Sequence, residues 1–172
     1  MTNKIKKKFA RIKLLALDFD GIMTNGKVRV DQNGIESVEC SRKDGLGIAF
    51  LKKHGTGVCV ISKETNPVVT ARCKKLEIPC MQAVKDSDGK AEILKRLIQK
   101  KGLAKEEVAF LGDDLNDIGA LKSAGLAVTV SDGHQNVKKV CHFVTSARGG
   151  QHAVREIAEL ILNARGINLD KF

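Results

Sequence analysis

The sequence predicts a single α/β domain in which helices flank a Rossmann-like parallel sheet and a β-hairpin is inserted after the first strand. Short, uniformly apolar segments alternate with amphipathic ones, a pattern typical of βαβ units whose sheet is covered on both faces. The chain has 172 residues, of which 42% are hydrophobic, so one domain can bury a substantial core. Aromatic residues make up only 3%, so aliphatic side chains must form most of that core.

Apolar runs predict the strands of the sheet. They cover residues 12–17, 58–62, 108–112, 126–130 and 143–144. Two further short segments, 28–30 and 35–39, flank an Asn33-Gly34 turn and predict the hairpin. Because the hairpin interrupts the alternation directly after the first strand, we expect it to lie over the carboxyl ends of the strands.

Apolar residues at helical spacing predict the helices. They cover residues 44–54, 67–76, 88–101, 116–124 and 151–162. Gly55 would stop the first helix, and Pro67 suits the first turn of the second. The third helix has the clearest apolar face, formed by Ala91, Ile93, Leu94, Leu97 and Ile98.

The predicted domain covers residues 12–165, with a basic segment at 1–11 before it and a tail at 166–172 after it. The net charge is +10, and part of the excess lies at Lys4, Lys6, Lys7, Lys8, Arg11 and Lys13. Basic charge favours anionic partners in general, yet the chain has no Trp or Tyr for base stacking and no Cys/His finger. We therefore interpret the segment as a solvated face or a frayed tail and predict no nucleic-acid partner.

Two absences predict a cytoplasmic protein with no membrane partner. No apolar stretch approaches the roughly 20 residues that a membrane helix needs, and no signal-peptide core follows the basic start. The five cysteines are odd in number and form no C-x-x-C pair, so we expect reduced thiols that act as small core residues. Zinc binding and cysteine nucleophiles are not expected, because no histidine lies at a suitable spacing.

Polar residues that could bind ligands or take part in catalysis follow the predicted strands. In such folds, ligands bind beyond the carboxyl ends of the strands. Asp18, Asp20 and Gly21 follow the first strand, Ser62 ends the second, and residues 112–117 follow the third with the sequence Gly-Asp-Asp-Leu-Asn-Asp. Lys90 opens the helix predicted from residue 88. Acids, a hydroxyl and a lysine are therefore expected at one edge of the sheet.

Such a cluster of acids predicts a bound cation. Two unit charges about 4 Å apart repel by roughly 4 kcal/mol at an effective dielectric constant near 20. A cation removes that cost, and a site made only of oxygen ligands suits Mg²⁺, which is commonly held by one or two carboxylates together with substrate phosphate.

Four motifs resemble, in the right order, those of the haloacid dehalogenase superfamily. Residues 18–24 read Asp-Phe-Asp-Gly-Ile-Met-Thr and look like the first motif, D-x-D-G-x-x-T/S. Ser62 fits the second motif, Lys90 the third, and residues 112–117 the fourth. The resemblance runs over nearly the whole chain. Lys85 is the rival for the third motif, but Lys90 fits better because it opens the helix.

The resemblance implies a role for each of these residues. Asp18 would attack phosphorus and form an aspartyl-phosphate, while Asp20 would act as general acid and then general base. Mg²⁺ would be held by Asp18, the Asp20 main-chain carbonyl and Asp113. Ser62 and Lys90 would contact the phosphoryl oxygens. Asp117 and Asp114 would lie behind them, with Asp117 orienting the metal ligands and Lys90. The predicted substrate-binding residues are Gly21, Arg42, Ser62, Lys63 and Lys90.

Within the superfamily, the chain resembles small tetrameric phosphatases of 3-deoxy-2-ulosonic acid phosphates. These act on 3-deoxy-D-manno-octulosonate 8-phosphate or on nonulosonate (sialic-acid-type) 9-phosphates, which implies a place in lipopolysaccharide or sialic acid biosynthesis. The matching stretches are residues 42–48 and 148–156. In that family the hairpins pack together at the centre of the tetramer, and a neighbouring subunit helps to cover the site.

The chain departs from the octulosonate enzymes at two places, which leaves the sugar open. They usually have Thr-Gly-Arg at the second motif, where residues 62–64 are Ser-Lys-Glu, and an Arg where this chain has Gln151. Residues 62–69 look closer to nonulosonate phosphatases and to the phosphatase-like domain of some acylneuraminate cytidylyltransferases. Candidates to receive the carboxylate of a sugar acid are Arg42, Lys63, Arg72 and Arg148.

Three other functions fit the sequence less well than a phosphatase. A non-catalytic oligomerisation or regulatory module would be expected to have lost Asp18 or Asp20. A phospho-receiver domain would carry its reactive Asp after the third strand and would lack the first motif. Nucleic-acid binding would depend on the basic segment alone. The four histidines, His54, His134, His142 and His152, are not predicted to be catalytic, because the Asp pair already supplies the proton transfers.

Overall fold

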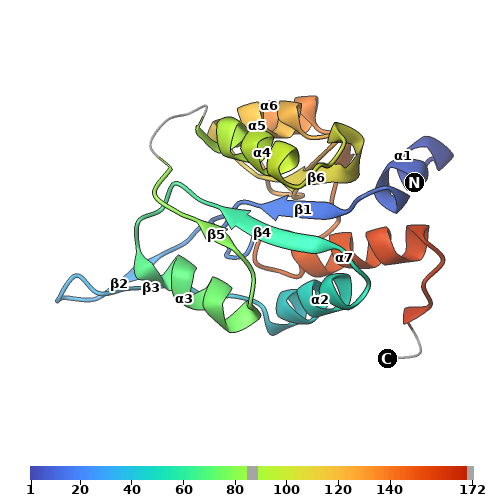
Figure 1. Ribbon diagram of the computed structural model, residues 1–172. Coiled ribbons are helices and arrows are strands. Elements are labelled where there is room, and N and C mark those ends of the chain that lie inside the picture. The colour runs from blue at the N-terminus through green and yellow to red at the C-terminus, as the bar shows by residue number, and fades with distance from the viewer. Residues whose placement is uncertain (85–88, 170–172) are drawn as a thin grey trace.

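The computed structural model describes residues 1–84 and 89–169. Within these residues, one six-stranded parallel sheet has the order β5-β4-β1-β6-β7-β8 (Figure 1). The strands are β1 (Leu14–Leu17), β4 (Gly57–Ile61), β5 (Cys80–Met81), β6 (Val108–Leu111), β7 (Leu126–Thr129) and β8 (Phe143–Val144). The Rossmann-like sheet predicted from the alternating pattern is confirmed, and β1 lies at its centre.

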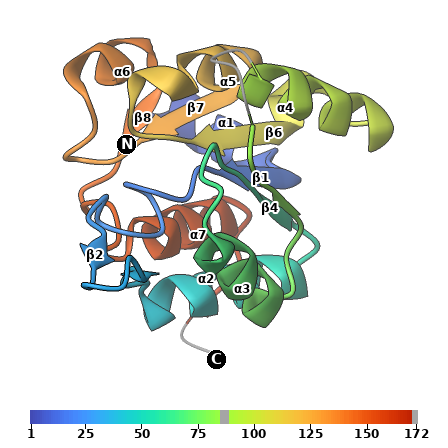
Figure 2. The same ribbon diagram turned by 90° about the vertical axis from the view of Figure 1, so that its left-hand side faces the viewer.

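Helices cover both faces of the sheet. Figure 2 shows α2, α3 and α7 in one layer and α4, α5 and α6 in the other. The helices are α1 (Asn3–Ala10), α2 (Arg42–Lys53), α3 (Pro67–Leu76), α4 (Gly89–Lys100), α5 (Ile118–Ser123), α6 (Gln135–Val140) and α7 (Ala153–Ala164), with short 3₁₀ turns η1 (Lys105–Glu107) and η2 (Leu115–Asp117). Each layer buries its own apolar cluster against the sheet.

The alternation of side chains along β1 divides the core in two. Leu15 and Leu17 belong to the cluster under α1, α2, α3 and α7, whereas Leu14 and Ala16 belong to the cluster under α4, α5 and α6. All four side chains are buried, as expected for a strand covered on both faces. The apolar run before Asp18 therefore holds that residue at the centre of the sheet edge.

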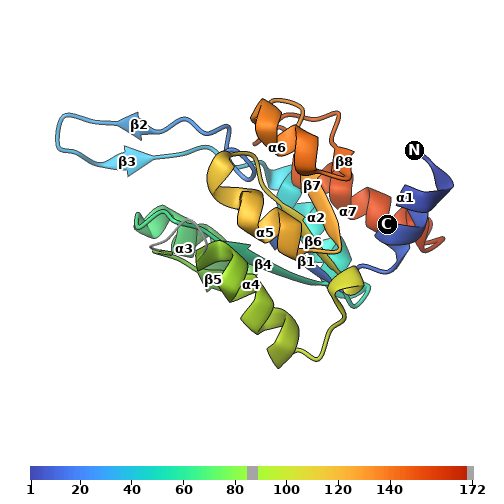
Figure 3. The same ribbon diagram turned by 90° about the horizontal axis from the view of Figure 1, so that it is seen from above.

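The predicted hairpin is present as β2 (Arg29–Val30) and β3 (Glu36–Ser37), which pair antiparallel. Figure 3 shows it projecting away from the rest of the molecule. Gly34 has a φ of +76° in the turn, and the Asp31 carboxylate accepts the backbone N–H groups of Asn33 and Ile35 at 2.8 Å. A Gly at this position avoids the steric cost that a left-handed backbone imposes on other residues.

Capping residues explain where the helices begin. The helix predicted from Asp44 starts at Arg42, because the Ser41 hydroxyl accepts backbone N–H groups of the first turn. The helix predicted over residues 116–124 is divided into η2 and α5. The final helix begins at Ala153 rather than at residue 151, because His152 has a left-handed backbone.

Helices α1 and α6, strand β5 and the short turn η1 were not predicted. The basic segment forms α1, which packs against α7 and buries Phe9 completely. The Phe9 ring meets that of Phe143 edge-on, with centroids 5.3 Å apart. Among the described residues, no helix combines the length and the apolar character that crossing a membrane requires. Residue 88, predicted to start a helix, and Lys85 lie outside the described residues.

Candidate active site

Asp18 lies directly after β1, at the point where the chain leaves the sheet. Its backbone N–H donates to the Leu111 carbonyl of β6 at 2.9 Å, so the ladder between the two strands extends to this residue. The Oδ1 atom accepts the Phe19 N–H at 2.7 Å and forms an ion pair of 2.8 Å with Lys90 Nζ. With 5% of its surface exposed, Asp18 is fixed in both position and direction.

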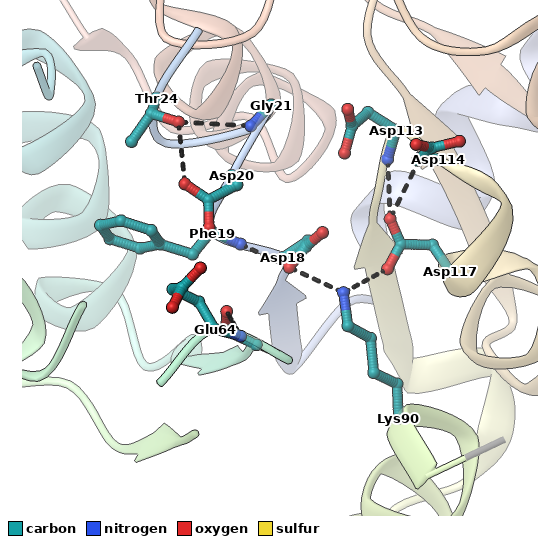
Figure 4. Close-up of polar contacts among 11 residues, drawn as sticks. Asp18, Phe19, Asp20, Gly21, Thr24, Glu64, Lys90, Asp113, Asp114 and Asp117 are labelled. Carbon is teal, nitrogen blue, oxygen red and sulfur yellow. Dashed lines mark hydrogen bonds and ion pairs between the residues drawn. The ribbon is translucent and has the colours of Figure 1, made fainter. Parts of the chain in front are cut away.

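Asp20 lies on the side of Asp18 away from Lys90, where the turn that follows β1 holds it (Figure 4). The buried Thr24 hydroxyl donates to Asp20 Oδ1 at 3.4 Å and accepts the Gly21 N–H at 3.3 Å. Gly21 has a φ of +74°, and a Cβ there would lie 2.0 Å from a carboxylate oxygen of Asp113. The glycine of the first motif therefore allows the loops after β1 and β6 to meet.

Lys90 projects from the first turn of α4 and joins two carboxylates. Its ammonium group lies 2.8 Å from Asp18 Oδ1 and 2.7 Å from Asp117 Oδ1, and its side chain is only 1% exposed. The other oxygen of Asp117 accepts the N–H groups of Asp113 and Asp114, at 2.9 Å and 3.3 Å. Asp117 thus contacts Lys90 directly, and its role in orienting that lysine stays a prediction.

Three carboxylates form a candidate cation site. Asp18, Asp113 and Asp117 each offer an oxygen, and these atoms lie within 4.8 Å of one another. Asp114, by contrast, is exposed and caps η2 by accepting the Leu115 N–H at 2.7 Å. Because hard oxygen ligands in this number suit Mg²⁺, the side chains present fit the predicted metal.

The electrostatics of the cluster favour a cation. Burial raises the pKa of the Asp18 carboxyl well above its usual range, and the nearby Asp117 charge adds to the effect. Burial, together with the charges of Asp117 and Asp114, raises the pKa of Asp113 to about 7. Burial opposes the Lys90 ammonium, but the charges of Asp18 and Asp117 outweigh it and raise the pKa of Lys90. A bound cation would stabilise the ionised carboxylates.

Ser62 and its neighbours form a loop after β4. Ser62 is buried, its N–H donates to the Met81 carbonyl at 2.9 Å, and its hydroxyl accepts the Glu64 N–H at 3.1 Å. Lys63 is half-buried. Glu64 lies beside Asp20 (Figure 4), and its charge adds to burial in raising the pKa of Asp20. The sequence offered no signal for this neighbour, because the contact joins two separate loops.

Within the described residues, the ion pairs of the acidic cluster involve Lys90 and none of the candidate arginines. Arg42 lines a cavity of about 350 Å³ between the start of α2 and the paired glycines, together with residues such as Ser41 and His152. Arg72 donates to the Ser41 carbonyl at 2.8 Å. Arg148 is exposed and lies 3.8 Å from the Asp132 carboxylate. Each of these side chains thus has a place outside the cluster.

Among the described residues, no cysteine or histidine side chain belongs to the three-carboxylate cluster. All five cysteines are free, and burial raises the pKa of the Cys59, Cys73 and Cys141 thiols to about 12, which suits inert core thiols rather than nucleophiles. His134 caps α6 by accepting the Asn136 N–H at 3.1 Å, and His152 lies 2.9 Å from the Ser41 hydroxyl.

The chain is similar in sequence to a known family of hydrolases and to curated phosphatases. A model of the haloacid dehalogenase-like hydrolase family matches residues 60–156. The chain is 32% identical to the 3-deoxy-D-manno-octulosonate 8-phosphate phosphatase of Salmonella typhi, over 96% of this chain and 87% of the relative. It is also 32% identical to the Haemophilus influenzae phosphatase of the same name, over 94% of this chain and 89% of the relative.

The chain also shares its fold with solved structures of such phosphatases. The Moraxella catarrhalis 3-deoxy-D-manno-octulosonate 8-phosphate phosphatase, in complex with magnesium ion, phosphate ion and KDO, is 35% identical, with a TM-score of 0.92 over 100% of this chain and 97% of that one. The Yersinia pestis phosphatase of the same name is 32% identical, with a TM-score of 0.91 over 96% and 89%. The match of the family model, the identity over nearly the full length and the shared fold show that the chain belongs to the haloacid dehalogenase-like hydrolases.

Proposed function

We propose that the protein is a Mg²⁺-dependent phosphatase that releases phosphate from 3-deoxy-D-manno-octulosonate 8-phosphate. The observation that carries the proposal is the placement of Asp18 between Asp20 and Lys90 at the carboxyl end of β1 (Figure 4). This arrangement supports the proposed roles of Asp18 as nucleophile, Asp20 as acid–base group and Lys90 as phosphate-binding cation. The named substrate of the similar phosphatases gives the sugar acid.

In the proposed reaction, Asp18 is the nucleophile and Asp20 is the general acid and base. A carboxylate oxygen of Asp18 attacks phosphorus, the bond to the sugar oxygen breaks, and Asp20 donates a proton to that leaving oxygen. In the second step Asp20 takes a proton from water, which attacks the aspartyl-phosphate and releases phosphate with free Asp18. The raised pKa of Asp20, caused by burial and the nearby Glu64 charge, favours the protonated form that the first step needs.

The positive and polar groups bind the phosphoryl oxygens in this proposal. The Lys90 ammonium lies 2.8 Å from Asp18 Oδ1, so it is placed to stabilise charge on a phosphoryl group beside that carboxylate. Ser62 would donate its hydroxyl to the same oxygens. Bound Mg²⁺ would supply further charge neutralisation there. Its proposed ligands are Asp18, Asp113 and the Asp20 main-chain carbonyl.

Asp117 has a different role in the proposal, although it lies in the carboxylate cluster. Both of its oxygens already have protein partners, Lys90 on one and the Asp113 and Asp114 N–H groups on the other. It therefore positions Lys90 and the loop after β6, leaving the metal to the other two carboxylates.

A nonulosonate 9-phosphate is the second candidate substrate. Glu64 places a carboxylate beside Asp20, whereas octulosonate enzymes usually have an Arg at the end of the second motif. A carboxylate on that loop would accept hydrogen bonds from hydroxyl groups of the leaving sugar, whereas the carboxylate that both substrates carry would have to bind elsewhere. The two substrates differ in the sugar that leaves, and the same catalytic groups serve both.

The proposal includes a cytoplasmic homotetramer whose hairpins pack together. On the hairpin, Val28, Val30 and Ile35 are 51%, 56% and 65% exposed, and such a cluster favours contact with another protein surface. The occupant we propose is the hairpin of a second copy. Light scattering should give the mass of a tetramer, and the double substitution Val30→Lys/Ile35→Lys should give smaller species. A monomeric wild-type protein would contradict this part of the proposal.

The test of the proposed reaction is phosphate release from a panel of substrates with Mg²⁺ and with EDTA. The panel contains the octulosonate 8-phosphate, two nonulosonate 9-phosphates and common hexose phosphates, and Asp18→Asn serves as the control. We expect Mg²⁺-dependent release from one sugar acid and none in the variant. No release by well-folded protein would overturn the proposal and favour a non-catalytic oligomerisation module.

A further inference from the structure

Helix α1 presents a basic face that the proposed phosphatase reaction does not use. Lys4, Lys7, Lys8 and Arg11 recur at intervals of three and four residues, which places them on one side of the helix. The opposite side carries the buried Phe9. The basic segment is therefore an ordered amphipathic element, and its charges point away from the core.

Hydrogen bonds fix the direction in which this basic face points. The Arg165 guanidinium, at the end of α7, donates to the carbonyl groups of Ala10 and Ile12. Lys8 Nζ donates to the Gly125 carbonyl at 2.7 Å, just before β7. The C-terminal half of α1 is thus attached to the body of the protein.

The basic face lines a hollow at the edge of the sheet where the strands begin. A cavity of about 230 Å³ is lined by Lys4, Lys7, Lys8, Arg11, Glu106 and Gly125. Four of these side chains are cationic and one is acidic. A larger cavity of about 730 Å³ shares Arg11 and Glu106 with it and adds Lys13 and Arg165. Figure 1 shows α1 at the end of the molecule opposite the tips of β1 and β4.

These cations have few anionic partners of their own. Within the described parts of the chain, the one ion pair formed by residues 1–13 joins Lys13 to Glu107 at 2.7 Å, and the first turn of α1 has no acidic residue. Like charges four residues apart, as at Lys4 and Lys8, destabilise a helix. The same charges act on the His142 imidazole. Partial burial lowers the pKa of His142, and the positive charges of Lys8, Lys105 and Lys4 lower it further.

We propose that this hollow, which we call the α1 cavity, binds an oligophosphate anion, either free or as the tail of a nucleotide. Ammonium and guanidinium groups form short, charge-assisted hydrogen bonds with phosphate oxygens, and several such groups around one hollow match an anion of several charges. A single-stranded nucleic acid fits less well, because such sites use aromatic side chains on which bases stack and the lining residues include none.

Calorimetric titration of the full chain tests the proposal. The probes are sodium tripolyphosphate, ATP and orthophosphate, in EDTA so that no metal links them to the acidic cluster. We expect tripolyphosphate to bind in a one-to-one ratio, and affinity to fall as salt rises. ATP binding as tightly as tripolyphosphate identifies a nucleotide tail as a sufficient ligand, and tighter binding of tripolyphosphate identifies the free anion. Orthophosphate should bind most weakly.

Paired variants locate the anion. Lys4→Gln/Lys7→Gln removes two cations that are exposed and helical, and we expect binding at least about tenfold weaker, since charge-assisted hydrogen bonds are lost. Lys95→Gln/Lys100→Gln removes two exposed cations of α4 and should bind like the wild type. Circular dichroism of each variant confirms that α1 and the fold remain.

A proton NMR titration of His142, whose pKa the charges of Lys8 and Lys4 help to lower, gives a second measurement. Bound tripolyphosphate should raise the pKa of His142 in the wild type and in the α4 variant, but not in Lys4→Gln/Lys7→Gln. Binding that the α1 substitutions leave unchanged would place the anion elsewhere and overturn the proposal. So would an oligonucleotide that binds far more tightly than tripolyphosphate, which would make the surface a nucleic-acid site.

Discussion

Asp44 lies in the first turn of α2, yet its Oδ1 accepts the Arg155 N–H at 2.8 Å in the first turn of α7. It is 1% exposed, and its Oδ2 is buried without a hydrogen-bond partner among the described residues. The left-handed His152 supplies no side-chain cap to α7. A single carboxylate therefore joins two neighbouring helices that the sequence separates widely.

Two substitutions of Asp44 distinguish the contribution of its hydrogen bond from that of its charge. We expect Asp44→Ala to lower the free energy of unfolding by about 1 kcal/mol, the usual worth of a helix cap, whereas Asp44→Asn keeps the acceptor. Urea unfolding measures both. Equal losses in the two variants would contradict a capping role.

The same pair of variants tests the pH dependence at this residue. Burial raises the pKa of Asp44 in the folded protein above the roughly 3.9 of an unfolded chain. The folded state therefore binds the proton more tightly, and this group's contribution to stability falls as pH rises through the raised pKa. Asp44→Asn has no such proton, so its stability should decline less over that range. Unfolding curves at several pH values check the difference.

Lys90 neutralises two buried carboxylates, and its loss should be costly. Lys90→Met leaves Asp18 and Asp117 without their shared ammonium, which should lower the free energy of unfolding by about 3 kcal/mol in EDTA, as for other broken buried ion pairs. Added Mg²⁺ should recover part of the stability but not the activity. Lys95→Met, on the exposed side of the same helix, should stay within about 0.5 kcal/mol of the wild type. A similar loss in both variants would contradict the role of the ion pairs.

At the scale of elements, the loop before α7 supports the loop after β1. The Gly150 N–H donates to the Ile22 carbonyl at 2.9 Å. A Cβ on Gly149 would lie 1.8 Å from the Gly21 carbonyl oxygen. Since that atom belongs to the backbone, it cannot move without displacing the turn that holds Asp20.

Gly149→Ala should therefore reduce turnover as well as stability. We expect kcat to fall at least about tenfold, because small displacements of a catalytic group reduce the rate strongly. The control is Gly57→Ala at the other end of the sheet, where a new Cβ would meet a leucine methyl group at an ordinary 3.4 Å. Phosphate release and thermal unfolding of both variants measure the effects. Unchanged kcat in Gly149→Ala would show that the two loops move independently.

The predicted elements are encoded by residues within their own segments, whereas the missed elements depend on contacts with distant segments. Helix α3 begins at Pro67 and ends at Leu76 as expected, because its capping residues and periodicity are encoded in the segment itself. Strand β5 has only two residues and exists because β4 pairs with it. Helix α1 was not predicted because lysines dominate its sequence and Phe9 is its one buried residue. Contacts between distant segments decide such elements, and a single sequence does not display them.

The candidate site follows the same division. Asp18, Asp20, Lys90 and Asp113 were expected from the ends of strands and from the four motifs, and the structure gathers them at one edge. The proximity of Glu64 to Asp20 was not expected, since it depends on how two loops fold toward each other. The sequence thus predicted the charged groups at the centre of the site better than those at its rim.

For the whole molecule, protons and Mg²⁺ should compete at the acidic edge. The pKa of Asp113 is raised to about 7, so the metal-free protein holds a proton there more tightly when folded and loses stability as pH rises from about 4 through about 7. Mg²⁺ binds the ionised form. The rise in Tm caused by Mg²⁺ should therefore be larger at a pH of about 8 than at about 5.5.

Thermal unfolding with and without Mg²⁺ at the two pH values checks this expectation. Asp113→Asn removes the group that titrates at this position, so the effect of the metal should be smaller and should differ less between the two pH values. An equal rise in Tm at both pH values in the wild type would mean that the proton on Asp113 does not compete with the cation.

β1 is synthesised early but completed late. It lies at the centre of the sheet, between β4 and β6, and β6 begins only at Val108. A nascent chain is synthesised at about 5–20 residues per second. The edge of β1 that pairs with β6 therefore has no partner until residues 108–111 have been made. Asp18 and Asp113 meet at the same late moment. A chain interrupted before β6 consequently lacks both the strand that completes the centre of the sheet and the Asp113 carboxylate of the candidate cation site.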